Sequence, residues 1–392
     1  MAGKVENRGQ NMKKVFIYAY LAQNLGDDLM VRILCERYPH IKFKIYATKE
    51  YRKIFRDIPN LKICSWEDRK AKIWDSFWKR VRNTENGYWK MLIKLSDGVV
   101  HVGGSSFTQH YDNFEELVQA DEKLRNLSKK LYVLGVNFGP YSDENYYKRY
   151  SWLFAKYDGV TFRDQFSYNL FSCLKNVRWA PDIVFNYPVK RGKYKEKKQI
   201  LFSVIELERR NGKYALNQWC EAYERFIAKM AEVAMEQGYQ VMFVGFCEMQ
   251  GDMDAIENIK GRICEKKRKD IQVYCYTGDL EACMRLFEES EKIVGTRFHS
   301  IILGWLFQKK VLPIVYDDKT RNLLEDNKYR TFLEFENLAL ADPREMFNKM
   351  ESLPQTELQI LVQEAERQFW AVDKFLGKSR EKEGAADGNT IN

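Results

Sequence analysis

The residues best suited to chemistry are Arg297 and His299, which lie in the segment Gly295-Thr296-Arg297-Phe298-His299-Ser300. Histidine is scarce in this chain, with four among 392 residues, and its imidazole exchanges protons near neutral pH. Arginine carries a fixed positive charge and matches carboxylate or phosphate groups with paired hydrogen bonds. In an extended segment these two side chains share one face, with Phe298 on the other. The pair therefore predicts an anion-binding site with a group suited to general acid–base catalysis.

The same segment joins an expected strand to an expected helix. The short run 292–294 is typical of a buried strand, and the apolar stretch 301–307 is typical of a buried helix. Open α/β sheets bind ligands at the carboxyl ends of their strands. Because a buried arginine without an anion is costly, we expect an anionic ligand beside Arg297. The alternative is that His299 is a core histidine and that Arg297 is its neighbour by accident.

A second motif, Asn24-Leu25-Gly26-Asp27-Asp28, follows the apolar run 15–20. Gly26 permits a tight turn, and either aspartate is a suitable N-cap for the helix that follows. In a functional interpretation, Asn24 or one of the aspartates binds hydroxyl groups of a substrate. The motif lacks the glycine spacing of dinucleotide-binding folds.

Three more motifs follow expected strands in the same way. Gly103-Gly104-Ser105-Ser106 lets backbone N–H groups approach an anion or a sugar, or forms only a structural turn. It has no P-loop lysine, which argues against nucleotide hydrolysis. Arg163-Asp164 offers a guanidinium for an anion, with Asp164 either orienting the arginine or capping the next helix. Tyr316-Asp317-Asp318-Lys319 adds a second cation, Lys319, at an adjacent strand end.

Apolar runs alternate with helix-like segments along the chain, which predicts parallel sheets covered by helices on both faces. The Lys- and Gly-rich stretch 188–199 lacks periodicity and divides the alternation into two halves. We therefore predict an α/β protein with two Rossmann-like lobes, over 12–188 and 199–350, and an active cleft between them. A terminal helix is expected over 355–377 and a disordered polar tail over 378–392.

The composition narrows the classes of partner and location. The net charge of +9 is spread along the chain, which argues against nucleic acid and favours an anionic small substrate, an anionic membrane surface or a simple solvated surface. The eight cysteines include no CxxC pair, so no metal site is expected. The sequence contains neither a signal-peptide pattern nor a run of about 18 apolar residues that would span a membrane. The expected location is the cytoplasm, with peripheral contact at the inner face of the membrane left open.

Taken in order, these motifs resemble those of the polysaccharide pyruvyl transferase family. Each match is short, but the ordered set is specific and extends over about residues 12–325. Ser105 stands where the family often has a third glycine, and Thr296 stands where methionine is common; neither departure removes a charged group. The matching segments are 24–28, 103–104, 163–167, 181–182, 295–300 and 316–319.

The resemblance implies a relative of the glycosyltransferase B architecture that takes pyruvate from phosphoenolpyruvate and forms a ketal on a sugar. That sugar belongs to a cell-surface polysaccharide or to its lipid-linked precursor. Phosphoenolpyruvate is then a co-substrate, and no cofactor or metal is implied. The residues expected in catalysis are His299, Arg297 and Asp27. Donor binding, mainly on the second lobe, is expected from Arg163, Arg297, Lys319 and Ser300. Acceptor binding, on the first lobe, is expected from Asn24, Gly26, Asp27, Gly103, Gly104 and Ser105.

Two other hypotheses stay open beside this one. A glycosyltransferase that uses a nucleotide sugar would place Arg297 and Lys319 on the diphosphate. A non-catalytic subunit of a glycan-assembly system would keep the fold, recruit partners and tolerate the loss of His299. The sequence leaves the oligomeric state open under all three.

Overall fold

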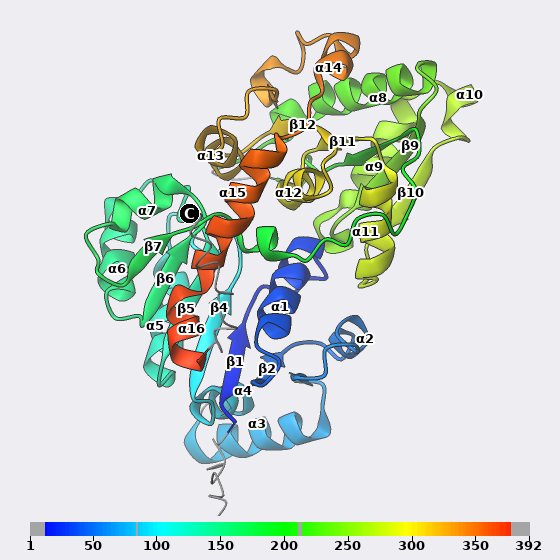
Figure 1. Cartoon of the computed structure of the whole chain (residues 1–392). Helices are drawn as coiled ribbons and strands as arrows, with labels where there is room; N and C mark the ends of the chain where they lie inside the picture. Colours follow the sequence, from blue (N-terminus) through cyan, green and yellow to red (C-terminus); the bar gives the residue numbers. More distant parts are fainter. Residues whose placement is uncertain (1–11, 84, 211–213, 378–392) are drawn as a thin grey trace, which may run out of the picture.

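The chain folds around two parallel β-sheets, one in each half of the sequence (Figure 1). A computed structural model describes residues 12–83, 85–210 and 214–377. The first residues of the chain and the predicted disordered tail over 378–392 lie outside the described residues.

The first sheet has the strand order β3-β2-β1-β4-β5-β6-β7, and its neighbouring strands are parallel. The central strands β4 and β5 are buried along their whole length, as expected for a sheet covered on both faces. The strands are β1 (Lys14–Tyr18), β2 (Lys42–Tyr46), β3 (Leu61–Cys64), β4 (Gly98–Val102), β5 (Leu131–Val136), β6 (Gly159–Phe162) and β7 (Val177–Trp179). The connecting helices are α1 (Leu25–Arg37), α2 (Tyr51–Ile54), α3 (Arg69–Arg82), α4 (Gly87–Lys94), α5 (Glu115–Leu127), α6 (Glu144–Phe154), α7 (Gln165–Phe171) and the 3₁₀ turn η1 (Ile183–Asn186).

The second sheet has the order β10-β9-β8-β11-β12-β13 and is also parallel. Its strands are β8 (Gln199–Ser203), β9 (Gln240–Gly245), β10 (Gln272–Cys275), β11 (Lys292–Gly295), β12 (Lys310–Val315) and β13 (Leu333–Glu334). Its helices are α8 (Cys220–Glu236), α9 (Asp252–Arg262), α10 (Glu265–Arg268), α11 (Leu280–Glu289), α12 (Phe298–Leu306), α13 (Asp318–Asp326) and α14 (Pro343–Lys349). Short 3₁₀ turns complete this half at η2 (Asn217–Trp219), η3 (Glu248–Gln250) and η4 (Phe335–Asn337).

Both sheets reverse their strand order at the first strand. In the first sheet β1 pairs with β2 on one side and β4 on the other, and β8 does the same with β9 and β11. The segments that follow two such neighbouring strands lead to opposite faces of the sheet. This opens a crevice at the carboxyl ends of the strands. This topology positions the loops after β1, β4, β8 and β11 for ligand binding.

The C-terminal segment returns from the second lobe to the first. It consists of α15 (Gln355–Ala365), the 3₁₀ turn η5 (Glu366–Phe369) and α16 (Trp370–Leu376), so a 3₁₀ turn interrupts the helix expected over 355–377 (Figure 1). Gln368 in that turn is fully buried. Its amide oxygen accepts from the Gly135 N–H at 2.9 Å, and its amide nitrogen donates to the Ala180 carbonyl at 2.8 Å. These bonds fasten the segment to the first sheet.

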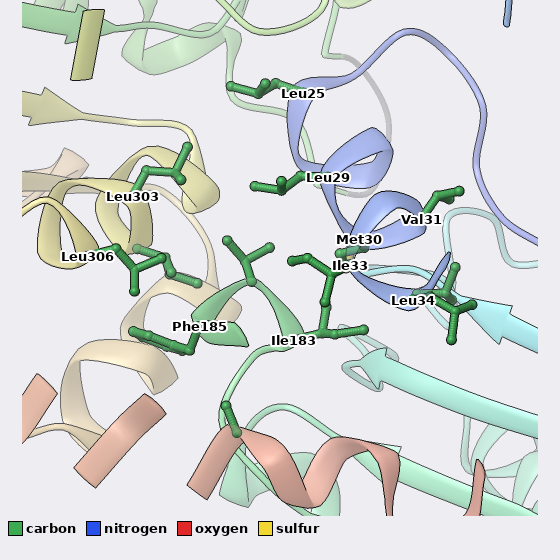
Figure 2. Close-up of a cluster of buried hydrophobic side chains, with 14 of the residues drawn as sticks. Leu25, Leu29, Met30, Val31, Ile33, Leu34, Ile183, Phe185, Leu303 and Leu306 are labelled. Atoms are coloured by element: carbon green, nitrogen blue, oxygen red, sulfur yellow. The ribbon is translucent and has the colours of Figure 1, made fainter. Parts of the chain in front are cut away.

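A continuous apolar core joins the two lobes. Figure 2 shows side chains of α1, η1 and α12 facing one another, among them Leu29, Phe185 and Leu303. All three are fully buried, and each such side chain contributes about 2 kcal/mol by leaving water. The same junction carries a backbone hydrogen bond between lobes, from the Leu25 N–H to the Phe246 carbonyl at 3.1 Å. The core therefore fixes where α1 and α12 begin relative to each other.

Two further features of the fold are the state of the cysteines and the length and polarity of the helices. All eight cysteines are free thiols. In the part of the chain that the structure describes, no helix combines the length and the apolar character needed to cross a membrane.

Candidate active site

A cavity of about 770 Å³ lies between the two lobes. Its walls come from the segments that follow β1, β4 and β6 in the first lobe and β8, β9, β11 and β12 in the second. The two sheets therefore present their carboxyl ends to a shared space. The predicted site residues that line it are Asn24, Asp27, Gly104, Ser105, Arg163, Arg297, His299 and Lys319.

His299, in the first turn of α12, reaches across the lobe boundary to α1. A Cβ atom on Gly26 would overlap the imidazole Nδ1, so only glycine allows α1 to approach so closely. On the other side, Nε2 lies 3.7 Å from Oδ2 of Asp182, a carboxylate that is 1% exposed. Nε2 has no hydrogen-bond partner among the described residues. A carboxylate behind an imidazole helps to set the orientation of the ring.

Asp182 also pairs with Arg163. Its Oδ2 lies 3.0 Å from Nη1 of that arginine, and both side chains are buried. Burial acts to raise the pKa of the Asp182 carboxyl, but the neighbouring His299 and Arg163 side chains lower it below its ordinary value. Asp182 is therefore a carboxylate that holds an arginine and a histidine together. In the sequence it stood out only as part of the matching segment 181–182.

Arg163 is fixed from three further directions. Its Nη2 donates to the Asn137 amide oxygen at 2.6 Å, and its guanidinium lies 4.1 Å from the centre of the Phe298 ring. A Cβ atom on Gly104 would come within 2.9 Å of its Nη1, so the glycine lets the loop pass close to the guanidinium. The Ser105 hydroxyl donates to the same Asn137 oxygen at 3.3 Å. The Gly104-Ser105 turn thus forms one wall of the site around Arg163.

Arg297 pairs with Asp252, a residue that sequence reasoning missed. Its Nε donates to Asp252 Oδ2 at 3.1 Å, its Nη2 pairs with Oδ1, and both side chains are buried. Asp252 also accepts the N–H groups of Phe246 and Cys247, at 2.8 and 3.1 Å. Burial acts to lower the pKa of the Arg297 guanidinium, but Asp252 outweighs it and raises the pKa. Asp252 therefore offsets the cost of burying Arg297, and the burial of this arginine does not require an anionic ligand as was expected from the sequence.

Lys319, at the start of α13, is also paired with a carboxylate of the protein itself. Its Nζ lies 2.8 Å from Asp317 Oδ2, and the two side chains are 21% and 20% exposed. Burial acts to lower the pKa of Lys319 and to raise that of Asp317. The attraction between the two charges outweighs burial, so the pKa of Lys319 is raised and that of Asp317 is lowered. Because its ammonium group is still accessible from the cavity, Lys319 can reach an anion there.

Asp27 faces the positive groups across the cavity. Burial raises the pKa of its carboxyl, against the opposing effect of His299, Arg163, Lys319 and Arg297. A raised pKa favours a carboxyl that accepts and donates protons at working pH. Asp27 and His299 therefore lie in one cavity as two groups able to exchange protons.

The structure shows which residues cap the helices near the site. Asn24 caps α1, with its side chain accepting from the Gly26 N–H at 3.0 Å. Neither aspartate of the motif is needed for this, which leaves Asp27 directed at the cavity. Asp164 caps α7 and accepts from the Ser167 N–H at 2.8 Å, whereas Asp182 provides the carboxylate beside Arg163.

Gly26, Gly103 and Ser300 lie behind the cavity wall rather than on it. A Cβ atom on Gly103 would come within 2.6 Å of the Ser106 hydroxyl oxygen, so this glycine keeps the turn tight. The Ser300 hydroxyl is buried and donates to the Arg297 carbonyl at 2.5 Å. These residues support the shape of the site.

Further polar residues of the cavity were missed because they look ordinary in the sequence. Asp121 lies in the middle of α5, and His101 lies in the apolar strand β4. Burial raises the pKa of Asp121 to about 7 and lowers that of His101 to about 4. Arg209 and Arg210 follow β8, and only their place after a strand could have indicated them.

Asp121→Asn is expected to make stability less dependent on pH. Since the folded-state pKa of Asp121 is about 7 and the unfolded value is near the usual one for aspartate, the folded protein binds more protons between them. Stability therefore falls as pH rises from about 4 to 7. The free energy of unfolding of the wild type should fall between pH 5 and pH 8, and replacing the carboxyl by an amide should reduce this fall by about 2 kcal/mol. Denaturant unfolding at both pH values measures this, with the exposed Asp270→Asn as control; equal pH dependence in wild type and Asp121→Asn would contradict it.

One family of known proteins matches most of the chain. The sequence profile of the polysaccharide pyruvyl transferase family matches residues 24–318. The amylovoran biosynthesis protein AmsJ of Erwinia amylovora is 23% identical over 237 residues, which are 55% of this chain and 55% of that protein. The match thus extends over about half the length of this relative.

Solved structures share the fold over nearly the whole chain. The structure of Anabaena HepE in complex with UDP and glucose has a TM-score of 0.56 and 10% identity, covering 93% of this chain and 99% of that one. The S. aureus MnaA–UDP structure has a TM-score of 0.55 and 11% identity, covering 95% of this chain and 99% of that one. At these identities the likeness concerns the fold alone. It confirms the predicted α/β class with two Rossmann-like lobes in a glycosyltransferase-B-like arrangement.

Proposed function

The chain belongs to the polysaccharide pyruvyl transferase family, and from this premise we propose that it transfers pyruvate from phosphoenolpyruvate to a sugar as a ketal. The sugar is part of a cell-surface polysaccharide or of its lipid-linked precursor. The observation that supports this most is the meeting of His299, Asp27, Arg163 and Lys319 in one cavity between the lobes. Such a site offers proton exchange beside positive charge, and this transfer needs both.

The chemistry assigns separate tasks to these groups. A proton added to the methylene carbon of phosphoenolpyruvate leaves positive charge at its central carbon, and a sugar hydroxyl attacks that carbon and loses its proton. The C–O bond to phosphate then breaks, and a second hydroxyl of the same sugar closes the ketal with loss of its own proton. In our proposal His299, oriented by Asp182, supplies the first proton, and Asp27 accepts a hydroxyl proton. Asn24 binds the acceptor on the first lobe.

The anionic donor is bound by cations of both lobes. Arg163 and Lys319 carry this task in our proposal, although each also has an internal carboxylate. Arg210 lines the same cavity, and among the described residues it has no carboxylate partner. Arg297, held by Asp252, acts mainly through position: it braces the turn from which His299 projects. In this proposal the carboxylate and phosphate of the donor are bound by these three cations, and the proposal includes no metal ion.

Lys319→Met tests the donor assignment. Loss of a charged hydrogen bond to phosphate is expected to raise the KM for phosphoenolpyruvate by about tenfold or more. The exposed Lys175→Met, outside the cavity, should leave KM unchanged. In thermal unfolding, phosphoenolpyruvate should raise the Tm of the wild type more than that of Lys319→Met. Stabilisation by UDP-sugars but not by phosphoenolpyruvate would instead favour a nucleotide-sugar transferase.

A further inference from the structure

Helix α3 (Arg69–Arg82) carries apolar side chains on the face that it turns to solvent. Ile73 is 60% exposed, Phe77 54% and Val81 57%. A spacing of four residues places these three on one side of a helix. Trp74, 37% exposed, adds a fourth large apolar side chain beside them. Few monomeric proteins leave such a contiguous apolar stripe uncovered without a use for it.

The side of α3 that lies opposite the apolar stripe packs against the rest of the protein. Ala71 is fully buried, the Asp75 carboxylate accepts the Tyr88 N–H of α4 at 2.7 Å, and the Trp78 ring lies against Gly87 of α4. The helix is thus held in place by α4 on one side. The apolar stripe of Ile73, Phe77 and Val81, with Trp74, is not part of that contact.

Basic residues surround this stripe. The exposed cations of α3 are Arg69, Lys70, Lys72, Lys79 and Arg80. Asp75 is the one acidic residue in the α3 sequence, and it is engaged with α4. In Figure 1, α3 lies at the end of the first lobe that is farthest from the second lobe. Lys79 lies 3.8 Å from the Glu85 carboxylate, and both side chains are exposed. The exposed surface of the helix therefore combines large apolar side chains with an excess of positive charge.

We propose that α3 docks the protein on an anionic lipid surface, with the stripe of Ile73, Trp74, Phe77 and Val81 inserted among the acyl chains and the cations on lipid phosphates. An amphipathic helix rich in Lys and Arg, with Trp and Phe on its apolar side, has the composition of an interfacial membrane helix. Each cation near an anionic surface strengthens binding, and salt weakens it.

Two other occupants match this surface less well. A second copy of the chain packed symmetrically on this stripe would bring two basic helices together, and like charges would oppose that contact. Residues 1–11 and 378–392, which lie outside the described residues, are predominantly polar and offer no apolar segment to cover the stripe. A membrane that supplies both acyl chains and negative headgroups matches both features of the surface.

The test is sedimentation of the full chain with vesicles. The wild type should bind vesicles of phosphatidylglycerol and phosphatidylcholine in equal parts about tenfold more strongly than vesicles of phosphatidylcholine alone. Ile73→Ser/Phe77→Ser should abolish binding, and Arg69→Gln/Arg80→Gln should weaken it by about tenfold on the anionic vesicles alone. Leu340→Ser, at an apolar residue that is 88% exposed elsewhere, is the matched control and should bind as the wild type does.

Thermal unfolding and far-UV circular dichroism show that each variant is folded. Bound protein should also show a blue shift of tryptophan fluorescence that Ile73→Ser/Phe77→Ser loses. The proposal is overturned if the wild type does not bind anionic vesicles, or if a folded Ile73→Ser/Phe77→Ser variant binds them as well as the wild type. A dimer that this variant dissociates, without any vesicle binding, would assign the stripe to self-association. This inference does not rest on the proposed reaction.

Discussion

Gly26→Ala is expected to lower kcat by about two orders of magnitude or more. A Cβ atom at this position would overlap the His299 imidazole, and the backbone cannot retreat, because Leu25 is hydrogen-bonded to Phe246 of the other lobe at 3.1 Å. The imidazole must therefore turn or the lobes must separate. Either displacement takes His299 out of line with Asp182. Overpacking should also cost about 1–3 kcal/mol of stability. Steady-state kinetics and denaturant unfolding measure both effects.

Two controls accompany this prediction: the same substitution at a different glycine, and Gly26→Ala in a protein that lacks the imidazole of His299. A Cβ atom on Gly261 of α9 would meet nothing within 4 Å, so Gly261→Ala should leave kcat unchanged. In a His299→Ala background the overlap is gone, and Gly26→Ala should then cost little stability. A Gly26→Ala enzyme with wild-type kcat would show that this close approach is irrelevant to turnover.

His299→Gln and Asp182→Asn are expected to lower kcat by similar and non-additive amounts. Loss of an acid–base group costs about 10²–10⁴-fold. Asp182→Asn removes the carboxylate that orients His299 and should approach the same loss, with the double variant little worse than either single one. Asp182→Asn should in addition destabilise the fold by about 3 kcal/mol, because Arg163 then loses the buried carboxylate 3.0 Å from its Nη1. His299→Gln should leave stability close to that of the wild type.

The kinetic double-mutant cycle distinguishes a catalytic pair from a structural one. If Asp182 served only to hold Arg163, its replacement would raise the KM for the donor and leave kcat unchanged. The effects of the two substitutions would then multiply. Independent, multiplying losses in kcat would contradict the coupling of Asp182 to His299.

Much of the site could be predicted because its parts follow strands directly in the sequence. Arg163, His299 and Lys319 each lie within a few residues of a buried apolar run, and the carboxyl ends of parallel strands meet at one edge of a sheet. The alternation of strands and helices predicted both sheets for the same local reason. The motif order then indicated the family, which the comparison confirmed over residues 24–318.

The missed residues depend on contacts between distant parts of the chain. Asp252 precedes Arg297 by 45 residues, and nothing local indicates that the two side chains pair. Without that partner, the sequence argument assigned the counter-charge of Arg297 to a ligand. Asp121 likewise looks like a solvated helix residue, and only packing of α5 against the cavity reveals its burial. Tertiary pairing of charges is thus what the local pattern could not predict.

Mass analysis of the product tests the central claim most directly. The wild-type protein is incubated with phosphoenolpyruvate and a glycan acceptor, and His299→Gln serves as the inactive control. The proposed function predicts an acceptor heavier by the mass of one pyruvate ketal, with one phosphate released per product, and neither in the control. An acceptor that stays unmodified with phosphoenolpyruvate but gains the mass of a sugar from a nucleotide sugar would contradict it.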